Sequence, residues 1–377
     1  KKIDETLFDV LLIDKINHHQ FQPLFYQVAT SQLEPASISF PLRNIFKTKK
    51  NLQIRLAEVL FIDSANNKIK TTIGEFCYDL LVIAIGCTTN FFGNDELKSH
   101  AFTLKTTYDA INIRNHILQT FENIISAEAG EKEGLMNLTI VGAGPTGVEL
   151  AGAFAEIKKN ILPKDYPNID FTHFKINLIE GSKDTLNSMS LLAKRTSKKY
   201  LQKMGVNIIT ETFVKRYDGN FLELSNGNII KSKTVIWAAG VIGNTIKGLP
   251  DSVQKVGNRI DVNRTNLVNG TQNIFALGDI AFMQTPKYPN GHPQVANVAI
   301  NQAKYLAYNL NKTKTNEFEY NDLGSMATIG RNKAVVDLPH FKFKGYFAWL
   351  IWMFLHLMLI LSVRNKLIIF INWVWAY

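Results

Sequence analysis

The chain of 377 residues has little cysteine: Cys77 and Cys87 are the only two, and they form no Cys-x-x-Cys pair. This scarcity excludes a disulfide-stabilised scaffold, a cysteine metal site and the redox dithiol of disulfide reductases. It also favours a reducing compartment, where disulfides are rare. Because no charged base lies near Cys87 in the sequence, we interpret it as a small buried residue rather than a nucleophile.

A concentrated basic patch is also lacking, although the formal net charge is +10. Basic residues are scattered, and the aromatic residues lie mainly in apolar runs. We therefore expect no nucleic-acid binding. An anionic membrane surface or anionic cofactors explain the charge better. No set of metal ligands and no acid/base cluster stands out, so we expect no bound metal. The length of the chain allows two or three domains, each with its own hydrophobic core.

Residues 138–152 carry the strongest motif. An apolar run, 138–141, meets Gly142-x-Gly144-x-x-Gly147 and passes directly into a helical pattern. In dinucleotide-binding units these glycines allow a tight turn, the approach of a pyrophosphate and close helix–strand packing. The phosphates lie on the N–H groups of the helix N-terminus. The candidate NAD-binding residues here are Gly142, Gly144, Pro145, Thr146 and Gly147.

The next apolar run, 175–179, ends in Glu180. A carboxylate at this position suits a ribose diol and repels a 2′-phosphate, which favours NAD over NADP. The spacing from Gly142 to Glu180 exceeds the usual 20 or so residues. We attribute the excess to a proline-containing excursion at 163–167.

An earlier run, 8–14, reads as a buried strand ending in Asp14, the second strand of another nucleotide-binding unit. Its glycine-rich first turn is expected roughly 20–30 residues upstream and is absent from these residues. A fragment explains this better than nucleotide binding without a phosphate loop. Further strands are expected at 54–61, 68–72 and 78–86.

Two apolar strands closed by glycine, at Gly86 and Gly240, bracket the central nucleotide unit. This layout predicts an α/β fold in which one Rossmann-like domain is inserted in another, followed by a helical C-terminal segment. Amphipathic periodicity predicts a helix at 106–127 with a buried stripe. Further elements are expected as helices at 190–204 and 293–310, a strand at 206–209 and a meander turning at 226–227.

The segment 21–30 resembles type II, or alternative, NADH:quinone oxidoreductases, and the resemblance continues through nearly the whole chain. It implies an FAD site, and it implies that Glu149 lies near the nicotinamide and the flavin. From the sequence alone, Glu149 reads equally well as a helix-dipole partner. The residues expected to bind FAD are Asp14, Tyr26, Gln27, Gly86, Gly278, Asp279 and Ala296, and Gly240 joins the NAD set.

The segment 293–302 is similar to the family pattern Ala-Gln-x-Ala-x-Gln-Gln, which lines the flavin face and the quinone pocket there. Asn297 and Asn301 stand where the family has Gln. Asparagine carries the same amide on a shorter stem. The resemblance therefore implies quinone contacts at Asn297, Asn301 and Gln302, with Glu149 and Gln302 as the catalytic candidates.

Residues 346–363 carry no formal charge. This uncharged run is just long enough to be considered as a membrane-spanning helix. Arg364, Lys366 and the aromatic run 367–377 instead favour a helix pair lying in the membrane interface. The family is similarly monotopic, which implies a peripheral position on the cytoplasmic face. A spanning segment and a buried dimer helix are the alternatives, and dimerisation is implied by the resemblance alone.

We expect an FAD domain at 1–105 and 242–330, an NAD domain at 106–241 and a membrane-anchoring segment at 331–377. The expected activity is oxidation of NADH by hydride transfer to FAD, followed by two-electron reduction of a membrane quinone, either menaquinone or ubiquinone. No polytopic bundle with buried ionisable residues is present, so proton pumping is not expected. The alternatives are a soluble FAD-dependent NAD(P)H reductase with another acceptor and a non-catalytic NAD(H)-sensing membrane adaptor.

Overall fold

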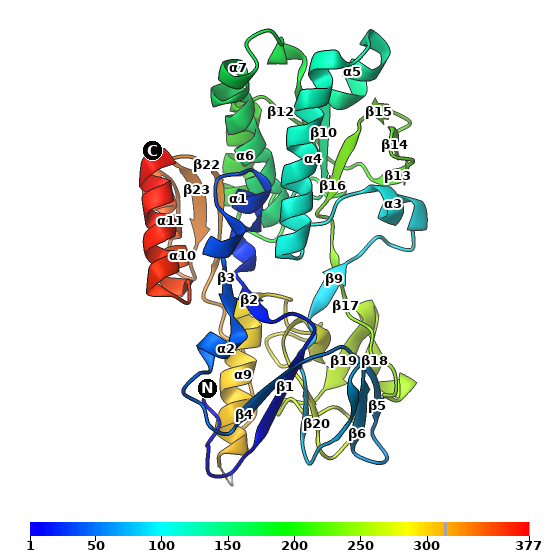
Figure 1. The fold of residues 1–377 in the computed structure, drawn as a ribbon, viewed down its shortest axis with the longest axis vertical. Helices are drawn as coiled ribbons and strands as arrows, with labels where there is room; N and C mark the ends of the chain where they lie inside the picture. The colour runs from blue at the N-terminus through cyan, green and yellow to red at the C-terminus, as the bar shows by residue number, and fades with distance from the viewer. Residues whose placement is uncertain (313–314, 377) are drawn as a thin grey trace. The chain divides into compact units, whose positions relative to one another are not determined.

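The computed structural model describes residues 1–312 and 315–376. Its chain forms two compact units (Figure 1). The first comprises 1–19, 41–88 and 241–322, and the second comprises 20–40, 89–240 and 323–377. The chain leaves the first unit and returns to it, so the expected insertion of one α/β domain in another is present. The expected assignment of domains to particular cofactors stays a prediction.

The first unit is built from short strands and one long helix. Its parallel pairs are β1–β4, β20–β8 and β19–β21, and β5, β6 and β7 form an antiparallel sheet. Its elements are β1 (Val10–Asp14), α2 (Leu42–Ile45), β4 (Leu52–Leu56), β5 (Val59–Asp63), β6 (Lys68–Thr71), β7 (Gly74–Cys77), β8 (Leu81–Ile83), β17 (Val241–Gly243), β18 (Gln254–Lys255), β19 (Arg259–Val262), β20 (Ile274–Ala276), β21 (Ala281–Met283) and α9 (Ala296–Leu310). Strands β2 (His18–Gln20), β3 (Ser39–Pro41) and β9 (Cys87–Thr89) lie where the chain crosses between units.

Three expectations for the first unit are wrong. Strand β1 is not buried: within the described residues it pairs only with β4, and Leu11 keeps 38% of its surface exposed. The single strand expected at 54–61 is two strands in two sheets, β4 and β5, separated at Ala57 and Glu58. Helix α9 begins at Ala296 instead of 293, because Val295 has an extended backbone.

The second unit contains a four-stranded parallel sheet in the order β12-β11-β10-β16. Its elements are α1 (Phe25–Ala29), α3 (Asp95–His100), α4 (Thr107–Ser126), α5 (Ala129–Leu135), β10 (Asn137–Val141), α6 (Pro145–Asn160), α7 (Leu162–Asp165), β11 (Lys175–Ile179), α8 (Leu191–Lys203), β12 (Val206–Ile209), β13 (Val214–Tyr217), β14 (Phe221–Leu224), β15 (Ile229–Lys231), β16 (Thr234–Trp237), β22 (Ser325–Gly330), β23 (Lys333–Asp337), β24 (Lys342–Gly345), α10 (Tyr346–Leu359) and α11 (Val363–Ala376). The expected α4 stripe is buried, and the predicted strand β12 and the turn at 226–227 are present.

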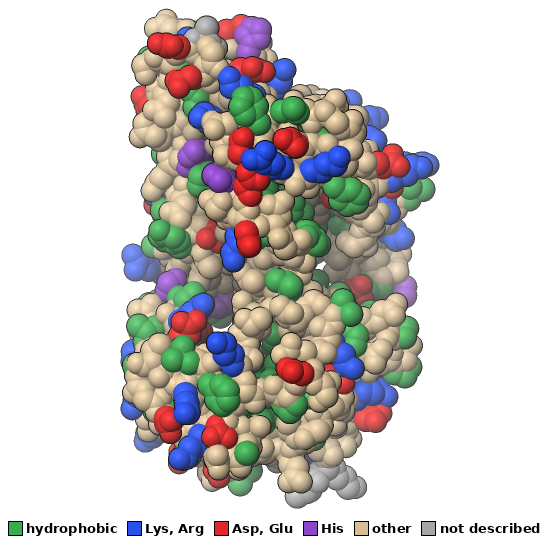
Figure 2. Space-filling model, turned by 90° about the vertical axis from the view of Figure 1, so that its right-hand side faces the viewer, with side chains coloured by type: hydrophobic (Ala, Val, Ile, Leu, Met, Phe, Trp, Pro, Cys, Tyr) green, Lys and Arg blue, Asp and Glu red, His purple; other side chains and the backbone are tan. Residues whose placement is uncertain are grey.

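The C-terminal part of this unit is an antiparallel sheet, β22-β23-β24, with the pair α10 and α11. The expected helix pair is therefore present. Each helix has 14 residues, and within 1–312 and 315–376 no helix combines the length and apolarity needed to cross a bilayer. Figure 2 shows that basic and acidic side chains are intermixed over the face in view.

Helix α6 and strand β22 pack together without an intervening side chain. A Cβ built on Gly152 would lie 1.9 Å from the carbonyl oxygen of Ile329. Ile329 is itself fully buried. Only glycine permits this approach, so Gly152 joins the nucleotide-binding helix to the C-terminal sheet.

We expect Gly152→Ala to destabilise the protein by about 1–3 kcal/mol, the usual cost of overpacking. Helix propensity alone predicts the opposite sign, because alanine is favoured over glycine by about 1 kcal/mol. The matched control is Gly130→Ala in α5, where no atom lies within 4 Å of the added Cβ. Thermal unfolding of both variants measures the effect, and equal midpoints for the two would contradict the packing argument.

Candidate functional site

The glycine turn between β10 and α6 has the geometry that the motif predicts. A Cβ on Gly142, at φ 102°, would lie 2.7 Å from the carbonyl atoms of Ala238. A Cβ on Gly147 would lie 1.8 Å from the carbonyl oxygen of Gly142. Gly144 precedes the helix and provides no side-chain cap, and a Cβ built on it would meet no atom within 4 Å. The helix N-terminus, with Pro145 and Thr146 exposed, is therefore open to an anion.

Glu180 lies against this turn although it is 37 residues from Ala143. Its Oε2 accepts the Ala143 N–H at 2.6 Å, and its Oε1 accepts the N–H and the hydroxyl of Ser182 at 2.8 and 2.7 Å. The predicted excursion at 163–167 overlaps α7, and a 3-10 turn at Phe171–His173 follows it before β11. Gly240, at φ 83°, follows the adjacent strand and accepts the Asn90 N–H. Folding thus brings the proposed phosphate and ribose contacts of a dinucleotide together.

In the first unit, a glycine-aspartate turn meets helix α9. The Gly278 N–H donates to Gln302 Oε1 at 2.7 Å, while the buried Gln302 Nε2 has no hydrogen-bond partner in the described protein. Asp279 Oδ2 accepts the Cys87 thiol at 3.0 Å. Asp14 ends β1, where its Oδ1 accepts the Ile16 N–H. These residues fit a flavin nucleotide. The carboxylates of Asp14 and Asp279 can accept hydrogen bonds from hydroxyl groups, and the Gln302 amide has an unsatisfied N–H donor.

Our interpretation of Cys87 is partly wrong. Its side chain is half-buried rather than buried, and a carboxylate far away in the sequence accepts its thiol. Sequence distance hid this pairing, since 192 residues separate Cys87 from Asp279. Gly86, at φ 67°, accepts the Asn244 N–H.

Helix α9 does not present the three predicted quinone-contacting residues on one face. Gln302 is fully buried with Val298 and Leu306, whereas Asn297 and Asn301 form the adjacent, half-buried stripe. Ala296, in the first turn of the helix, is exposed. Recognition of a quinone by these residues remains a prediction.

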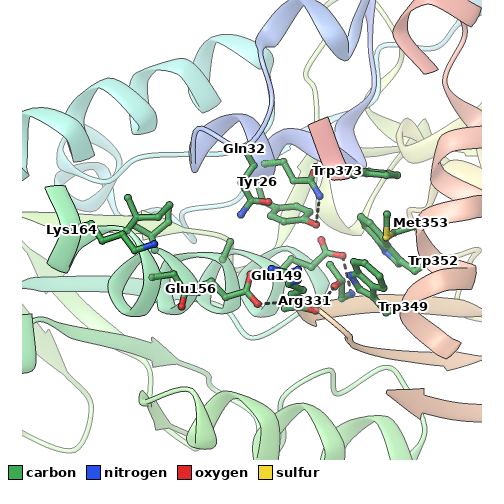
Figure 3. A pocket seen from close by; sticks show the side chains of 17 residues that line it. Tyr26, Gln32, Glu149, Glu156, Lys164, Arg331, Trp349, Trp352, Met353 and Trp373 are labelled. Atoms are coloured by element: carbon green, nitrogen blue, oxygen red, sulfur yellow. Dashed lines mark hydrogen bonds between the residues drawn. The ribbon is translucent and has the colours of Figure 1, made fainter. Parts of the chain in front are cut away.

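A cavity of about 570 Å³ lies within the second unit (Figure 3). Three predicted residues line it: Tyr26 and Gln27 from α1 and Glu149 from α6. Aromatic and apolar residues of the C-terminal helices close one end, and polar residues of α6, α7 and β22 form the other. The remaining lining residues are Gln32, Ala153, Glu156, Ile157, Asn160, Ile161, Lys164, Thr328, Gly330, Arg331, Trp349, Trp352, Met353 and Trp373.

The amide of Gln27 fixes two rings of this lining. Its Nε2 donates to the Tyr26 hydroxyl at 2.8 Å, and its Oε1 accepts the Trp373 indole N–H at 2.9 Å. Helix α11 is thereby hydrogen-bonded to the segment that the sequence assigned to flavin contact. Burial, followed by the charge of Glu149, raises the pKa of Tyr26, so the phenol stays protonated.

Glu149 is the principal ionisable group of the cavity. Burial raises its pKa to about 8, and the Thr328 N–H, 3.4 Å from Oε1, opposes that shift only weakly. At neutral pH most of this carboxyl is therefore protonated. A neutral carboxyl can donate a hydrogen bond or a proton to an oxygen atom, which a carboxylate cannot.

The sequence did not single out several cavity residues, above all Glu156, Arg331, Trp349 and Trp352. Glu156 carries a usable signal, because it follows Glu149 by seven residues and so lies on the same helix face. The other three come from the C-terminal segment, and their position depends on its packing against α6. No local pattern indicates that contact.

In comparisons with known proteins, residues 1–303 match the model of the pyridine nucleotide-disulphide oxidoreductase family. Residues 323–377 match the model of the NDH2 C-terminal domain. The type II NADH:quinone oxidoreductase Ndh of Mycobacterium tuberculosis is 32% identical, over 99% of this chain and 84% of that protein. The external NADH-ubiquinone oxidoreductase 2 of Saccharomyces cerevisiae mitochondria is 26% identical, over 100% of this chain and 78% of that protein. The fold matches that of NDH2 from Plasmodium falciparum, solved in complex with NADH, with a TM-score of 0.93 and 22% sequence identity. The match covers 99% of this chain and 94% of that chain.

We expect the high pKa of Glu149 to make stability fall as pH rises. The folded chain holds a proton up to about pH 8 that an ordinary carboxyl of pKa 4.5 has already released. Between these values wild-type stability should fall relative to that of Glu149→Gln, which cannot ionise, by at most about 1.4 kcal/mol per pH unit. Urea unfolding across this range measures the difference. Parallel curves for the two proteins would show that Glu149 ionises normally.

Proposed function

We propose that this chain, which belongs to the type II NADH:quinone oxidoreductase family of pyridine nucleotide-disulphide oxidoreductases, oxidises NADH and reduces a membrane quinone without pumping protons. FAD, when bound, supplies the redox chemistry by accepting a hydride and passing on two electrons. The protein binds and orients the reactants and supplies protons. The relatives named for NADH and quinone support this assignment.

NADH binds on the glycine turn of the second unit. The uncapped start of α6 receives the pyrophosphate, and Glu180 receives the ribose diol. A 2′-phosphate would meet the negative charge of Glu180, so NADH is favoured over NADPH. The flavin nucleotide is held by Asp14, Gly86, Gly278, Asp279 and Ala296, with Tyr26 and Gln27 near its ring; these contacts follow the family resemblance.

The single observation that carries the proposal is the cavity of the second unit. Nucleotide-binding turns occur in many oxidoreductases, but this cavity combines aromatic walls with a neutral carboxyl. Its volume falls in the range of small-molecule sites, about 300–1,000 Å³. A quinone ring packs on Trp352 and Trp349, and Glu149 donates to its oxygen. The predicted contributions of Asn297, Asn301 and Gln302 remain a proposal from the family pattern.

We place the membrane at α10 and α11. These helices expose many large apolar side chains; Lys342 and Lys344 lie in β24 directly before α10, and Arg364 and Lys366 lie in the first turn of α11. Such a surface suits the interface of an anionic bilayer, which also delivers the quinone. The cytoplasmic side remains part of this proposal. The most exposed large apolar residues are Phe347, Phe354, Leu359, Val363, Ile371 and Trp375.

The test of the activity is the visible spectrum of the full-length protein, purified in detergent and kept anaerobic. One equivalent of NADH should bleach a flavin band, and a soluble quinone should restore it. In Glu149→Gln, bleaching should be unchanged while the return slows by about 100-fold or more, the usual contribution of a general acid. Bleaching without return would favour another oxidant, and the absence of flavin would favour the nucleotide-binding adaptor.

The membrane surface is tested by flotation with vesicles of phosphatidylcholine, with and without phosphatidylglycerol. Wild type should float, and the anionic lipid should strengthen its binding. Phe347→Ser and Trp375→Ser should each weaken binding about tenfold or more, since burying such a side chain contributes roughly 1.5–3 kcal/mol. Val256→Ser, at an 88% exposed position of the other unit, is the matched control and should float normally. A non-floating dimer would mean that a second copy covers these helices.

A further inference from the structure

Two carboxyl groups of helix α6 line the cavity, and only one of them has a role so far. Glu149 and Glu156 are seven residues apart, two helical turns, which separates them by about 10 Å along the axis. Burial raises the pKa of both. Figure 3 shows Glu156 between Lys164 and Glu149, with Trp349, Trp352 and Met353 beyond Glu149.

Strand β22 and the turn that follows it hold both carboxyls in place. The Thr328 N–H donates to Glu149 Oε1 at 3.4 Å, and the Arg331 N–H donates to Glu156 Oε1 at 2.5 Å. The Gly152 contact between these positions brings helix and strand together. The pair is therefore fixed on one wall of the cavity, and the space between them has polar groups at both ends.

Other ionisable groups act on the two carboxyls differently. Glu149 faces the protonated Tyr26 hydroxyl of α1. Glu156 faces Arg331 and Lys333 from the C-terminal sheet, and both cations, together with the Arg331 N–H, oppose the rise of its pKa. Lys164 of α7 is exposed at the same end of the cavity. Glu156 thus lies nearer solvent and cations than Glu149 does.

Resting on the proposed function, we propose that Glu156 relays a proton from solvent through cavity water to Glu149, which passes a proton to the quinone oxygen. The overall reaction is NADH + quinone + H⁺ → NAD⁺ + quinol. The hydride supplies two electrons and one proton, and the second proton is the H⁺ taken up from solvent. The O–H bond of Glu149 breaks as the quinol O–H bond forms, and Glu156 then reprotonates Glu149 and recovers its own proton from solvent.

The cavity has room for this path. A separation of about 10 Å is spanned by roughly three waters at ordinary hydrogen-bond distances. At about 30 Å³ per water, such a chain occupies a small part of the 570 Å³. Glu156 does not touch the quinone, so it acts as a positioning residue for proton supply.

The test uses Glu156→Gln, which keeps an oxygen to accept the Arg331 N–H but loses the exchangeable proton. Stopped-flow spectra of the full-length protein should show NADH bleaching within twofold of wild type. Reoxidation by a soluble quinone should slow by roughly 10- to 100-fold, with a larger solvent deuterium isotope effect. Millimolar imidazole should restore the rate by carrying protons into the cavity, and Glu156→Asp should retain part of it.

Glu133→Gln, a surface change in α5, is the matched control and should behave as wild type. Infrared difference spectra give a readout besides activity: a protonated-carboxyl band should disappear in Glu156→Gln. Normal reoxidation in that variant, or slow reoxidation that imidazole does not rescue, would overturn the relay while leaving the proposed function intact. Failure of the wild type to be reoxidised by quinone would instead overturn the proposed function.

Discussion

The close approach of α6 to β22 is the contact on which the candidate site depends. Gly152 has no side chain, so the carbonyl of Ile329 reaches the helix surface. The carboxyls one turn to either side then accept backbone N–H groups: Glu149 from Thr328 in the strand and Glu156 from Arg331 in the turn after it. Any side chain at Gly152 would push the strand away and open both hydrogen bonds. One small residue thus aligns the acidic wall of the cavity with the C-terminal sheet.

This packing determines the electrostatics as well as the shape. Helix α6 begins at the glycine turn, where its N–H groups are open to an anion, and two to three turns later it lies under the C-terminal sheet. Carboxyls near a helix N-terminus are normally ionised, because the dipole favours their charge. Burial overrides that preference at Glu149, whose pKa rises to about 8. The N-terminus of this helix therefore presents positive potential to the phosphates of a dinucleotide, and Glu149 presents a neutral carboxyl to the quinone.

Much of the nucleotide-binding architecture was predictable, because its signals are local. The apolar run at β10, the three glycines and the α4 stripe each follow from backbone sterics or helical periodicity over a few residues. The wrong predictions of burial concern tertiary context: β1 and the side chain of Cys87 were both expected to be buried, and both are partly exposed. The family resemblance named Tyr26, Gln27 and Glu149, but residue patterns alone did not place them around one cavity.

The sequence by itself determined the main strands and helices of the nucleotide unit, where glycine is obligatory in it, and that a carboxylate ends its second strand. Periodicity and the steric demands of tight turns act over short stretches of chain. Only the tertiary structure decided that Glu180 bonds to the Ala143 amide, that Gln27 links Tyr26 to Trp373, and that Glu149 and Glu156 share a cavity with the C-terminal helices. These contacts join residues far apart in the chain, and the pKa of a carboxyl depends on everything packed around it.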